Sequence, residues 1–251
     1  MSNTSRGLAV TAHTATSAAG RGRAALHAAL RERRSGLRRN DFGPEGRLEC
    51  FIGRVDGVED EPLPSDLARW ECRNNRLAWL GLQADGFLDA ARAAIARHGA
   101  GRVALVIGTS TSSIGESEDA YAQLEDGHFA PRFARPIVHT PHSLGSFVQA
   151  ATGAQGPCVT VATACSSSAK VFAQAARLIG AGFADAAIVG GVDTLCGSVL
   201  YGFNSLGLVS TRPCRPFDVE RNGLSLGEAA GFALLERDGP GPRLLGWGES
   251  S

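Results

Sequence analysis

Three short, mostly apolar runs constrain the fold of this chain more than any other feature of the sequence. They span 102–107, 157–161 and 185–192, and the first is bounded by glycines on both sides. Runs of this length without polar alternation are typical of strands that are buried on both faces. The segments that follow the strands have helical patterns, among them 143–152. This alternation predicts a layered α/β domain with helices on both faces of the sheet and ligands at the strand ends.

The rest of the chain adds further expected elements. Strands are expected at 8–13, 51–55, 231–236 and 243–247, and the last two are expected to form a closing pair. Helices are expected at 20–34, 77–95 and 195–206, and the second of these is either continuous or split at Asp85-Gly86. Residues 40–66 are rich in glycine, proline and acidic residues, which indicates an irregular connection within one domain.

Composition excludes several classes of function. The formal net charge of the 251 residues is zero, so nothing in the charge balance favours a nucleic-acid or membrane partner. The six cysteines lack CxxC spacing, which gives no support for a metal site. We find no apolar leader segment and no apolar run of about eighteen residues. These observations predict a reduced, cytoplasmic protein without a membrane span.

Cys165 stands where the apolar strand that ends at Val161 gives way to an alanine-rich helix. Residues 165, 169, 172, 176 and 179 recur at helical spacing and predict an apolar stripe, and Gly180 and Gly182 end the helix. Unpaired amides and the helix dipole favour an anion at such a start, so a thiol there ionises more easily. We therefore predict that Cys165 is a catalytic nucleophile. Its position alone leaves open a small buried residue at a turn.

Two other polar stretches have alternative explanations. The loop 108–115 is rich in serine and threonine and could cradle a phosphate, but no lysine follows it as in a Walker motif. The basic stretch Arg31 to Arg39 closes a predicted helix, and its cations suit the negative end of the helix dipole. Neither stretch indicates a function by itself.

Several motifs occur together in one order along the chain. They are Val161 to Ser168, Ala187 to Asp193, Arg215 to Asp218 with Arg221 to Gly223, and Gly227 to Gly231. In this combination the chain resembles the β-ketoacyl-acyl carrier protein synthases, the condensing enzymes of fatty acid and polyketide synthesis. The resemblance begins near Leu8 and is most specific between Gly156 and Glu236. It implies a thiolase-like α/β fold with a mixed sheet.

The resemblance also implies that residues 1–251 are one amino-terminal half of a tandem pair. In the family, the carboxy-terminal half supplies two histidines, a lysine and part of the oxyanion hole, and we expect that half to be absent here. The six histidines do not fall in the matching motifs, and we interpret His139 and His142 as local packing or hydrogen-bonding residues. The chain stops at 248–251 directly after a predicted strand, which leads us to expect a truncation.

The implied reaction begins when the Cys165 thiolate takes an acyl group from a thioester on acyl carrier protein or coenzyme A. Malonyl thioester then loses carbon dioxide, and its enolate attacks the acyl group to give a 3-oxoacyl product. The Cys165 backbone N–H is a plausible oxyanion donor. Phe203 and Thr111 are expected to line the substrate pocket, although Phe203 could equally be a core aromatic. No metal or redox cofactor is implied.

The remaining expectations concern the signature motifs and partners. Arg215 and Asp218 are expected to pair, with glycines setting nearby turns, and Leu224 stands where the family usually has phenylalanine. A homodimer is expected through the strand 159–161. Arg69, Arg73 and Arg76 lie at roughly one-turn spacing and are expected to form a docking patch for an acidic carrier protein, with help from the 31–39 cluster.

Three alternative functions were weighed. A non-catalytic chain-length factor is disfavoured by the presence of Cys165, because such partners replace the nucleophile. A thiolase is disfavoured by the sequence Arg-Pro-Phe-Asp at 215–218. A non-catalytic interaction module remains open.

Overall fold

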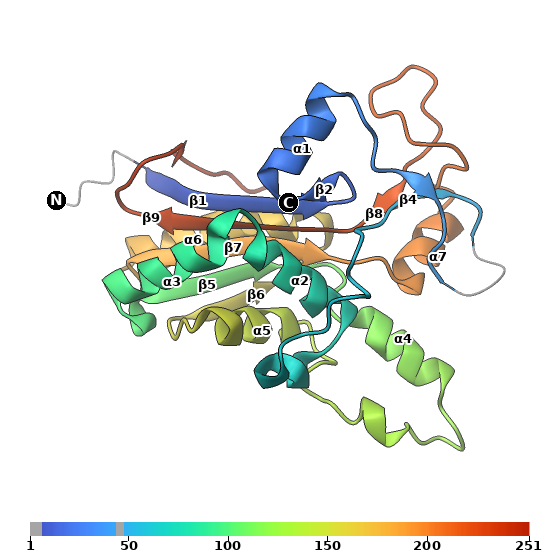
Figure 1. Cartoon of the computed structure of the whole chain (residues 1–251), viewed down its shortest axis with the longest axis horizontal. Coiled ribbons are helices and arrows are strands. Elements are labelled where there is room, and N and C mark those ends of the chain that lie inside the picture. The colour runs from blue at the N-terminus through green and yellow to red at the C-terminus, as the bar shows by residue number, and fades with distance from the viewer. Residues whose placement is uncertain (1–6, 44–47, 251) are drawn as a thin grey trace.

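A mixed seven-stranded sheet forms the centre of the computed structural model, which describes residues 7–43 and 48–250 (Figure 1). The strand order is β10-β1-β9-β7-β5-β6, with β2 paired to β1. β5 is parallel to β6 and to β7, whereas β9 is antiparallel to its neighbours β7 and β1. The strands are β1 (Leu8–Ser17), β2 (Gly20–Arg21), β5 (Val103–Gly108), β6 (Cys158–Val161), β7 (Ala186–Asp193), β9 (Ala229–Glu236) and β10 (Arg243–Leu244). The mixed sheet agrees with the expected fold class.

Residues of the central strands alternate between two hydrophobic layers. On β5, Val103, Leu105 and Ile107 belong to one buried cluster, while Ala104 and Val106 belong to the other. All six residues of β5 are buried. The apolar run at 102–107 therefore predicted this strand well, because a strand covered on both faces has no need of polar alternation.

Helices cover both faces of the sheet, as expected. α2 (Arg73–Gln83), α3 (Phe87–His98) and α5 (Ser143–Thr152) pack in one hydrophobic layer, where the rings of Phe87 and Phe232 stack 5.8 Å apart. α6 (Ser167–Gly180) packs on the opposite layer through Val171, Ala175 and Ile179. The prediction for 77–95 holds in its split form, because Asp85 and Gly86 both have positive φ between the two helices.

A smaller three-stranded sheet and three further helices lie beside this core. The small sheet contains β3 (Arg38–Arg39), β4 (Phe51–Gly53) and β8 (Leu226–Gly227) in that order. The helices are α1 (Gly22–Arg31), α4 (Ile114–Ala122) and α7 (Gly197–Ser205). Figure 1 shows α7 near β4 and β8, on the side of the molecule where α4 also extends away from the central sheet. Residues 44–47 of the predicted irregular connection, and residue 251, lie outside the described residues.

Several details differ from the sequence predictions. Within the helix expected at 20–34, Gly20 and Arg21 form β2, and α1 ends at Arg31. β9 and β10 do not pair with each other, because β1 lies between them and pairs with both. The helix expected to begin at Cys165 begins at Ser167, after the 3₁₀ helix η6 (Ala164–Ser166). The predicted apolar stripe is also displaced, because Cys165 and Ala169 are exposed while Val171 and Ala175 face the sheet. Within the described ranges, no helix is long and apolar enough to cross a membrane.

Candidate active site

Cys165 lies in a sharp turn between β6 and α6. The chain leaves β6 at Val161 and enters the short 3₁₀ helix that contains Cys165, and the side chain of Cys165 is exposed. Ala164, the residue before it, has φ +54°, a left-handed conformation that costs a non-glycine residue about 1–2 kcal/mol. Such strain persists only where surrounding contacts hold it in place. Residues 163–167 form this turn, which we call the elbow.

Two glycines let the start of α6 approach the sheet closely. A Cβ added at Gly108, the last residue of β5, would lie 2.7 Å from the backbone carbonyl carbon of Ser167. A Cβ at Gly191 on β7 would lie 2.0 Å from the Ser168 hydroxyl oxygen. Both distances are shorter than a real Cβ contact allows. These glycines thus seat the helix start, and with it the elbow, against the ends of β5 and β7.

Hydroxyl groups hold the elbow in its strained form. The carbonyl oxygen of Ala164 accepts hydrogen bonds from the Ser110 hydroxyl at 2.9 Å and the Ser167 hydroxyl at 2.7 Å. The Thr163 N–H in turn donates to the Ser167 hydroxyl at 2.9 Å. The Ser166 hydroxyl donates to the Thr163 carbonyl, also at 2.9 Å. Ser110 is the contributor from another element, because it belongs to the loop after β5.

Asp193 organises that loop from the end of β7. One carboxylate oxygen, Oδ1, accepts hydrogen bonds from the N–H groups of Ser110 at 2.6 Å and Thr111 at 2.9 Å. The same oxygen accepts from the hydroxyls of Thr109 at 3.0 Å and Thr111 at 3.1 Å. The ends of β5, β6 and β7 are therefore joined by one continuous set of hydrogen bonds. We call Asp193, Thr109, Ser110 and Thr111 the strand-end cluster.

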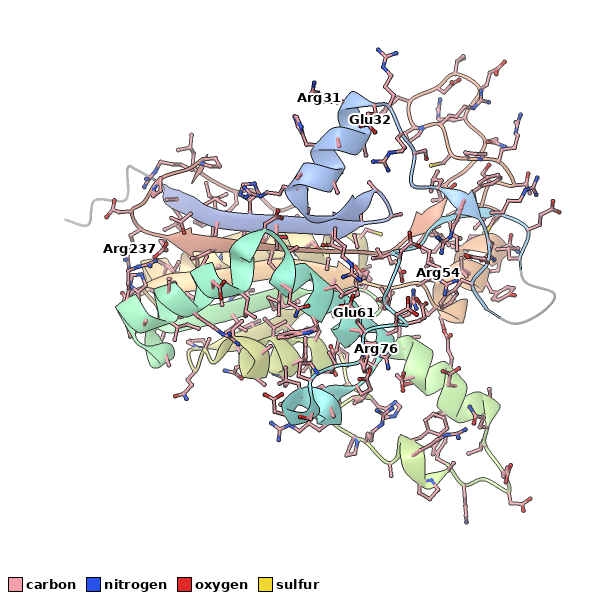
Figure 2. The ribbon with its side chains drawn as sticks, in the orientation of Figure 1. Arg31, Glu32, Arg54, Glu61, Arg76 and Arg237 are labelled. Carbon is pink, nitrogen blue, oxygen red and sulfur yellow. The ribbon has the colours of Figure 1, made fainter. Side chains whose placement is uncertain are left out.

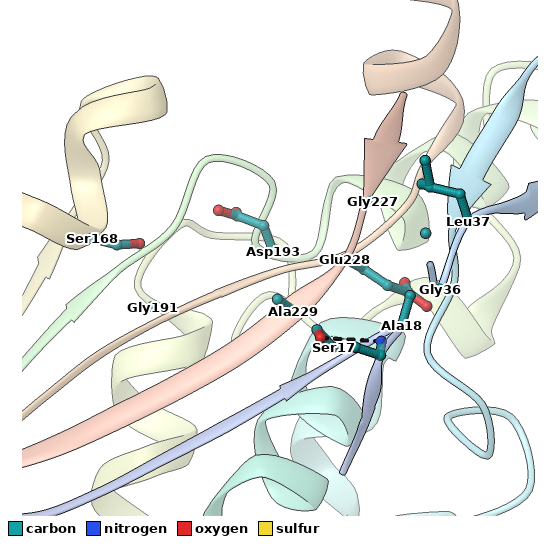
Figure 3. Close-up of a pocket in the computed structure, with 12 residues that line it drawn as sticks. Ser17, Ala18, Gly36, Leu37, Ser168, Gly191, Asp193, Gly227, Glu228 and Ala229 are labelled. Carbon is teal, nitrogen blue, oxygen red and sulfur yellow. Dashed lines mark hydrogen bonds between the residues drawn. The ribbon is translucent and has the colours of Figure 1, made fainter. Parts of the chain in front are cut away.

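A cavity of about 420 Å³ opens beside the start of α6 (Figure 3). Ser168 and Asp193 line it from one side, and Glu228 lies in its wall close to Ala229. The lining residues are Ser17, Ala18, Ala19, Gly36, Leu37, Gly53, Ser168, Gly191, Asp193, Gly227, Glu228 and Ala229. Two polar residues therefore border this open space: Ser168, which follows Cys165 by three residues, and Asp193 at the end of β7.

Cys165 is more exposed than the other five cysteines, and burial raises the pKa of most of the others. Burial raises the pKa of Cys72 to about 12, and it raises those of Cys158 and Cys196 to about 11. Burial also raises the pKa of Cys50. Cys214 is partly buried, and no disulfide joins any of the six cysteines, all of which lie in the described ranges. Of the six, Cys165 is the exposed one, as a nucleophile that meets an external thioester must be.

Thr111 and Phe203 lie in different surroundings from each other. Thr111 is buried, and its hydroxyl donates to Asp193 and accepts the Thr194 N–H at 3.1 Å. Its hydrogen-bonding capacity is therefore used in holding the loop, which favours a structural role over contact with substrate. Phe203 is half-buried on α7, so it is not the fully enclosed core aromatic that was the alternative.

A second cavity, of about 380 Å³, lies between the loop after β5 and the start of α7. Ser112, Ser113, Leu200 and Tyr201 are among its lining residues, together with the buried Asn74. The amide nitrogen of Asn74 has no hydrogen-bond partner among the described residues. Sequence patterns do not reveal this cavity, because its lining residues come from several separate segments between Phe42 and Tyr201.

The three arginines of the expected docking patch do not form one exposed surface. Arg69 belongs to the 3₁₀ helix η2 (Ser65–Trp70), and its guanidinium lies 3.8 Å from the centre of the Trp70 ring. Arg73 pairs with the buried Glu228 through two hydrogen bonds, of 3.0 and 2.6 Å, and also contacts Glu59. The one-turn spacing therefore does not place the three on one helix, because Arg69 belongs to η2 and α2 begins only at Arg73.

Arg76 is also engaged within the molecule. It pairs with Glu71 and donates to the carbonyl of Glu59 at 2.9 Å. Figure 2 shows Arg76, Glu61 and Arg54 in the region beside α2, where oppositely charged side chains gather. Ion pairs of this kind compete with an external acidic partner, so Arg69 is the member of the set that stays exposed.

His139 and His142 make local hydrogen bonds, in agreement with their interpretation from sequence. His139 Nδ1 lies 3.0 Å from the Ser117 hydroxyl, and His142 Nδ1 lies 2.8 Å from the Thr160 hydroxyl. The signature motifs after α7 also match expectation. Arg215 and Asp218 form an ion pair of 3.8 Å, and Gly223 has φ +118° in a turn where a side chain would strike the Leu208 carbonyl.

Residues 68–239 match the model of the β-ketoacyl synthase amino-terminal domain. The chain belongs to this family. It is 26% identical to a putative polyketide β-ketoacyl synthase 1 from Streptomyces virginiae, over 93% of the chain and 58% of that protein. It is 31% identical to the chloroplastic 3-oxoacyl-[acyl-carrier-protein] synthase I of Hordeum vulgare, over 76% of the chain and 42% of that protein. The chain thus spans about half the length of these relatives.

A solved structure supports the same fold. The chain superposes with a TM-score of 0.82 and 29% identity on a structure of the ketosynthase ApeO in complex with its chain length factor ApeC, from Xenorhabdus doucetiae. The match covers 96% of this chain and 60% of the other. The expected fold, a mixed sheet with helices on both faces as in the condensing enzymes, is confirmed.

Proposed function

We propose that this chain provides the nucleophile of a 3-oxoacyl-acyl carrier protein synthase, an acyltransferase of fatty acid or polyketide synthesis. The observation that carries the proposal is the exposed Cys165 in a strained elbow that the strand-end cluster holds in place. Membership of the β-ketoacyl synthase family supports it, because relatives such as the Hordeum vulgare protein are 3-oxoacyl-[acyl-carrier-protein] synthases.

In the proposed first step, the Cys165 sulfur attacks the thioester carbonyl and the carrier thiol leaves with a proton. This forms an acyl-enzyme and divides one difficult transfer into two easier ones. The carbonyl oxygen becomes an oxyanion during the attack, and the backbone N–H of Cys165 is the proposed donor to it. In the second step, malonyl thioester loses carbon dioxide and its enolate carbon displaces Cys165 from the acyl group.

The acyl chain is proposed to lie in the cavity between the loop after β5 and α7. Ser112 and Ser113 line that cavity and follow Thr111 directly, so it begins close to the loop that contacts the elbow. Leu200 and Tyr201 supply apolar surface from α7, the helix that also carries Phe203. Thr111 is proposed to support this pocket from behind rather than to touch the substrate.

We further propose that residues 1–251 act as the amino-terminal half of a condensing unit. The contacts of the described histidines support this. His98, His139 and His142 bond to Glu236, Ser117 and Thr160, and none of these partners belongs to the elbow. Decarboxylation needs groups that stabilise the enolate, and a carboxy-terminal half would supply them.

The decisive experiment offers hexanoyl-coenzyme A to the chain and maps the acylated peptide. Cys165 should carry the acyl group, Cys165→Ala should carry none, and the control Cys214→Ala should react normally. The chain alone should release little carbon dioxide from malonyl thioester, and a family carboxy-terminal half should restore release. Acylation at Cys214 instead, or efficient release by the chain alone, would contradict this assignment.

A non-catalytic partner or interaction module is the second candidate. It is favoured by the solved structure in which the ketosynthase ApeO is bound to a chain length factor, since both roles occur in that assembly. The same acylation experiment separates the two, because a non-catalytic partner takes no acyl group on Cys165.

A homodimer is proposed through β6. Among the described residues, this strand is at one end of the sheet order and pairs only with β5, so its other edge is available to a second copy across a two-fold axis. Sedimentation at micromolar concentration should show a dimer, and Thr160→Pro should dissociate it by disrupting the strand. A stable monomer of the unaltered chain would contradict the proposal.

Acyl carrier protein is the proposed donor partner, with acyl-coenzyme A as an alternative donor and with no nucleic acid involved. Arg69 is the exposed member of the predicted docking set. Arg69→Glu should slow transfer from the acidic carrier more than from acyl-coenzyme A, and salt should reduce the difference. Equal slowing with both donors would remove Arg69 from docking. The unpaired thiols favour a reducing, cytoplasmic location.

A further inference from the structure

The hydrogen bonds on the Ala164 carbonyl bear directly on the backbone N–H of Cys165. The two groups belong to the same peptide unit, which is planar, so the direction of the carbonyl fixes the direction of the N–H. A donor that holds the Ala164 oxygen therefore aims the Cys165 N–H as well. It also polarises that N–H, because hydrogen bonds along a chain strengthen one another.

Two serine hydroxyls hold this carbonyl, and they differ in what they are attached to. Ser167 lies three residues along the same turn, so its hydroxyl would move with the elbow. Ser110 is 54 residues away in the sequence, on the loop after β5. Its own backbone is fixed by the 2.6 Å hydrogen bond from its N–H to Asp193. Ser110 therefore fixes the position of the Ala164–Cys165 peptide relative to the end of β7.

Because Ala164 is strained, a hydrogen bond from outside the turn is needed to hold the Ala164–Cys165 peptide. Relief of the φ of +54° by rotation about the Ala164 N–Cα bond would swing the Ala164 carbonyl, and with it the Cys165 N–H, away from its present direction. The Ser110 hydroxyl opposes that rotation from outside the turn. Its donor distance of 2.9 Å is that of an ordinary strong hydrogen bond.

We propose that Ser110 is a positioning residue that aims the Cys165 N–H at the oxyanion formed when Cys165 is acylated. The inference rests on the proposed function, since it needs a thioester as the reactant. Ser110 acts through the peptide and does not touch the reacting atoms. Asp193 supports it by fixing the loop on which Ser110 stands.

Two reactions of the same thiol separate this role from a general effect on Cys165. Iodoacetamide alkylates the sulfur by displacing iodide from carbon, and no oxyanion forms. Hexanoyl-coenzyme A acylates the sulfur through a tetrahedral oxyanion and releases coenzyme A. Both rates are measured on the full chain by mass spectrometry of the Cys165 peptide. The variants are Ser110→Ala, Ser110→Thr and the control Ser205→Ala, whose lost hydroxyl also donates to a backbone carbonyl, that of Gly202, but lies outside the elbow and the strand-end cluster.

Ser110→Ala should slow acylation about tenfold or more and leave alkylation unchanged, because only acylation uses the N–H donor. Ser110→Thr keeps the hydroxyl and should restore most of the acylation rate, while Ser205→Ala should leave both rates intact. In spectra of the ¹⁵N-cysteine-labelled chain, Ser110→Ala should also shift the amide signal of Cys165, assigned through Cys165→Ala, and Ser205→Ala should leave it in place.

Three results would overturn the inference. Equal acylation by Ser110→Ala and the unaltered chain would remove the positioning role, and the proposed function would stand. A parallel fall in alkylation and acylation would show that Ser110 governs the thiol or the local fold rather than the N–H. No acylation of Cys165 in the unaltered chain would refute the proposed function, and the positioning role with it.

Discussion

Two acidic residues border the same cavity, and their carboxylates are held in opposite ways (Figure 3). Asp193 is half-buried and accepts hydrogen bonds from neutral amides and hydroxyls of one loop. Glu228 has a fully buried side chain and pairs with the guanidinium of Arg73. It also accepts the N–H groups of Val55 at 2.9 Å and Leu195 at 3.1 Å.

The difference indicates separate tasks for the two groups. The Glu228 carboxylate accepts hydrogen bonds from α2, from the segment after β4 and from the segment before α7. It therefore joins three distant parts of the chain. Removing one partner of a buried ion pair leaves the other charge without compensation, which is costly. The donors around Asp193 are neutral, so losing their acceptor leaves no uncompensated buried charge, and the Ser110 donor is exposed to water that can replace the acceptor. We infer that Glu228 mainly maintains the fold and Asp193 mainly maintains the elbow.

Glu228→Gln tests this contrast with the largest expected effect. The substitution keeps the shape of the side chain but removes its charge, so Arg73 loses its buried partner. The free energy of unfolding should fall by roughly 3 kcal/mol. Denaturant unfolding followed by circular dichroism measures it. Glu59→Gln removes the more exposed partner of Arg73 and should cost less than about 1 kcal/mol. Similar losses in both variants would mean that burial of Glu228 carries no special weight.

Asp193→Asn should affect the acylation rate more than the free energy of unfolding. Its amide oxygen can still accept hydrogen bonds, but weakly, because charge-assisted bonds are the stronger ones. The free energy of unfolding should fall by about 1 kcal/mol. Acylation of Cys165 should nevertheless slow markedly, since the loop that carries Ser110 is loosened. Rate and stability are compared in the same preparation. A stability loss as large as that of Glu228→Gln, with acylation intact, would reverse the two assignments.

Raising the pH should lower the free energy of unfolding by a smaller amount, because of the buried thiol of Cys72. This thiol precedes Arg73, and burial raises its pKa from 9.0 to about 12. The folded state therefore keeps a proton that the unfolded state loses, so stability falls as the pH rises above about 9, by at most about 1.4 kcal/mol per pH unit. Unfolding free energies at pH 8, 9 and 10 measure the slope. Cys72→Ala should reduce it. An unchanged slope in Cys72→Ala would assign the effect to other groups.

Local patterns in the sequence predicted the central elements well. β5, β6 and β7 were located to within one residue at each end, and α5 was predicted with its observed bounds. Uninterrupted apolar runs and helical periodicity are properties of neighbouring residues, so they can be read without the fold. The start of α6 was placed two residues early because apolar spacing does not distinguish a 3₁₀ turn from the first turn of an α-helix.

The site depended on contacts that no local pattern contains. Asp193 meets Ser110 across 83 residues, and Glu228 meets Arg73 across 155. The spacing of Arg69, Arg73 and Arg76 therefore predicted a surface patch, although Arg73 pairs with the distant Glu228 and Arg76 pairs with the nearby Glu71. Asp193 and Glu228 both lay within recognised motifs, but the motifs did not reveal what each side chain holds. The catalytic role of Cys165 stays a prediction until its acylation is measured.

The left-handed conformation of Ala164 has a consequence for the evolution of this turn. Glycine would adopt that conformation without the steric penalty, so selection for heat resistance alone would favour glycine at this position. Glycine would also free the peptide to rotate, and the aim of the Cys165 N–H would broaden. Selection for rate should therefore retain alanine. Position 164 is thus a place where adaptation to temperature and adaptation of turnover are expected to oppose each other.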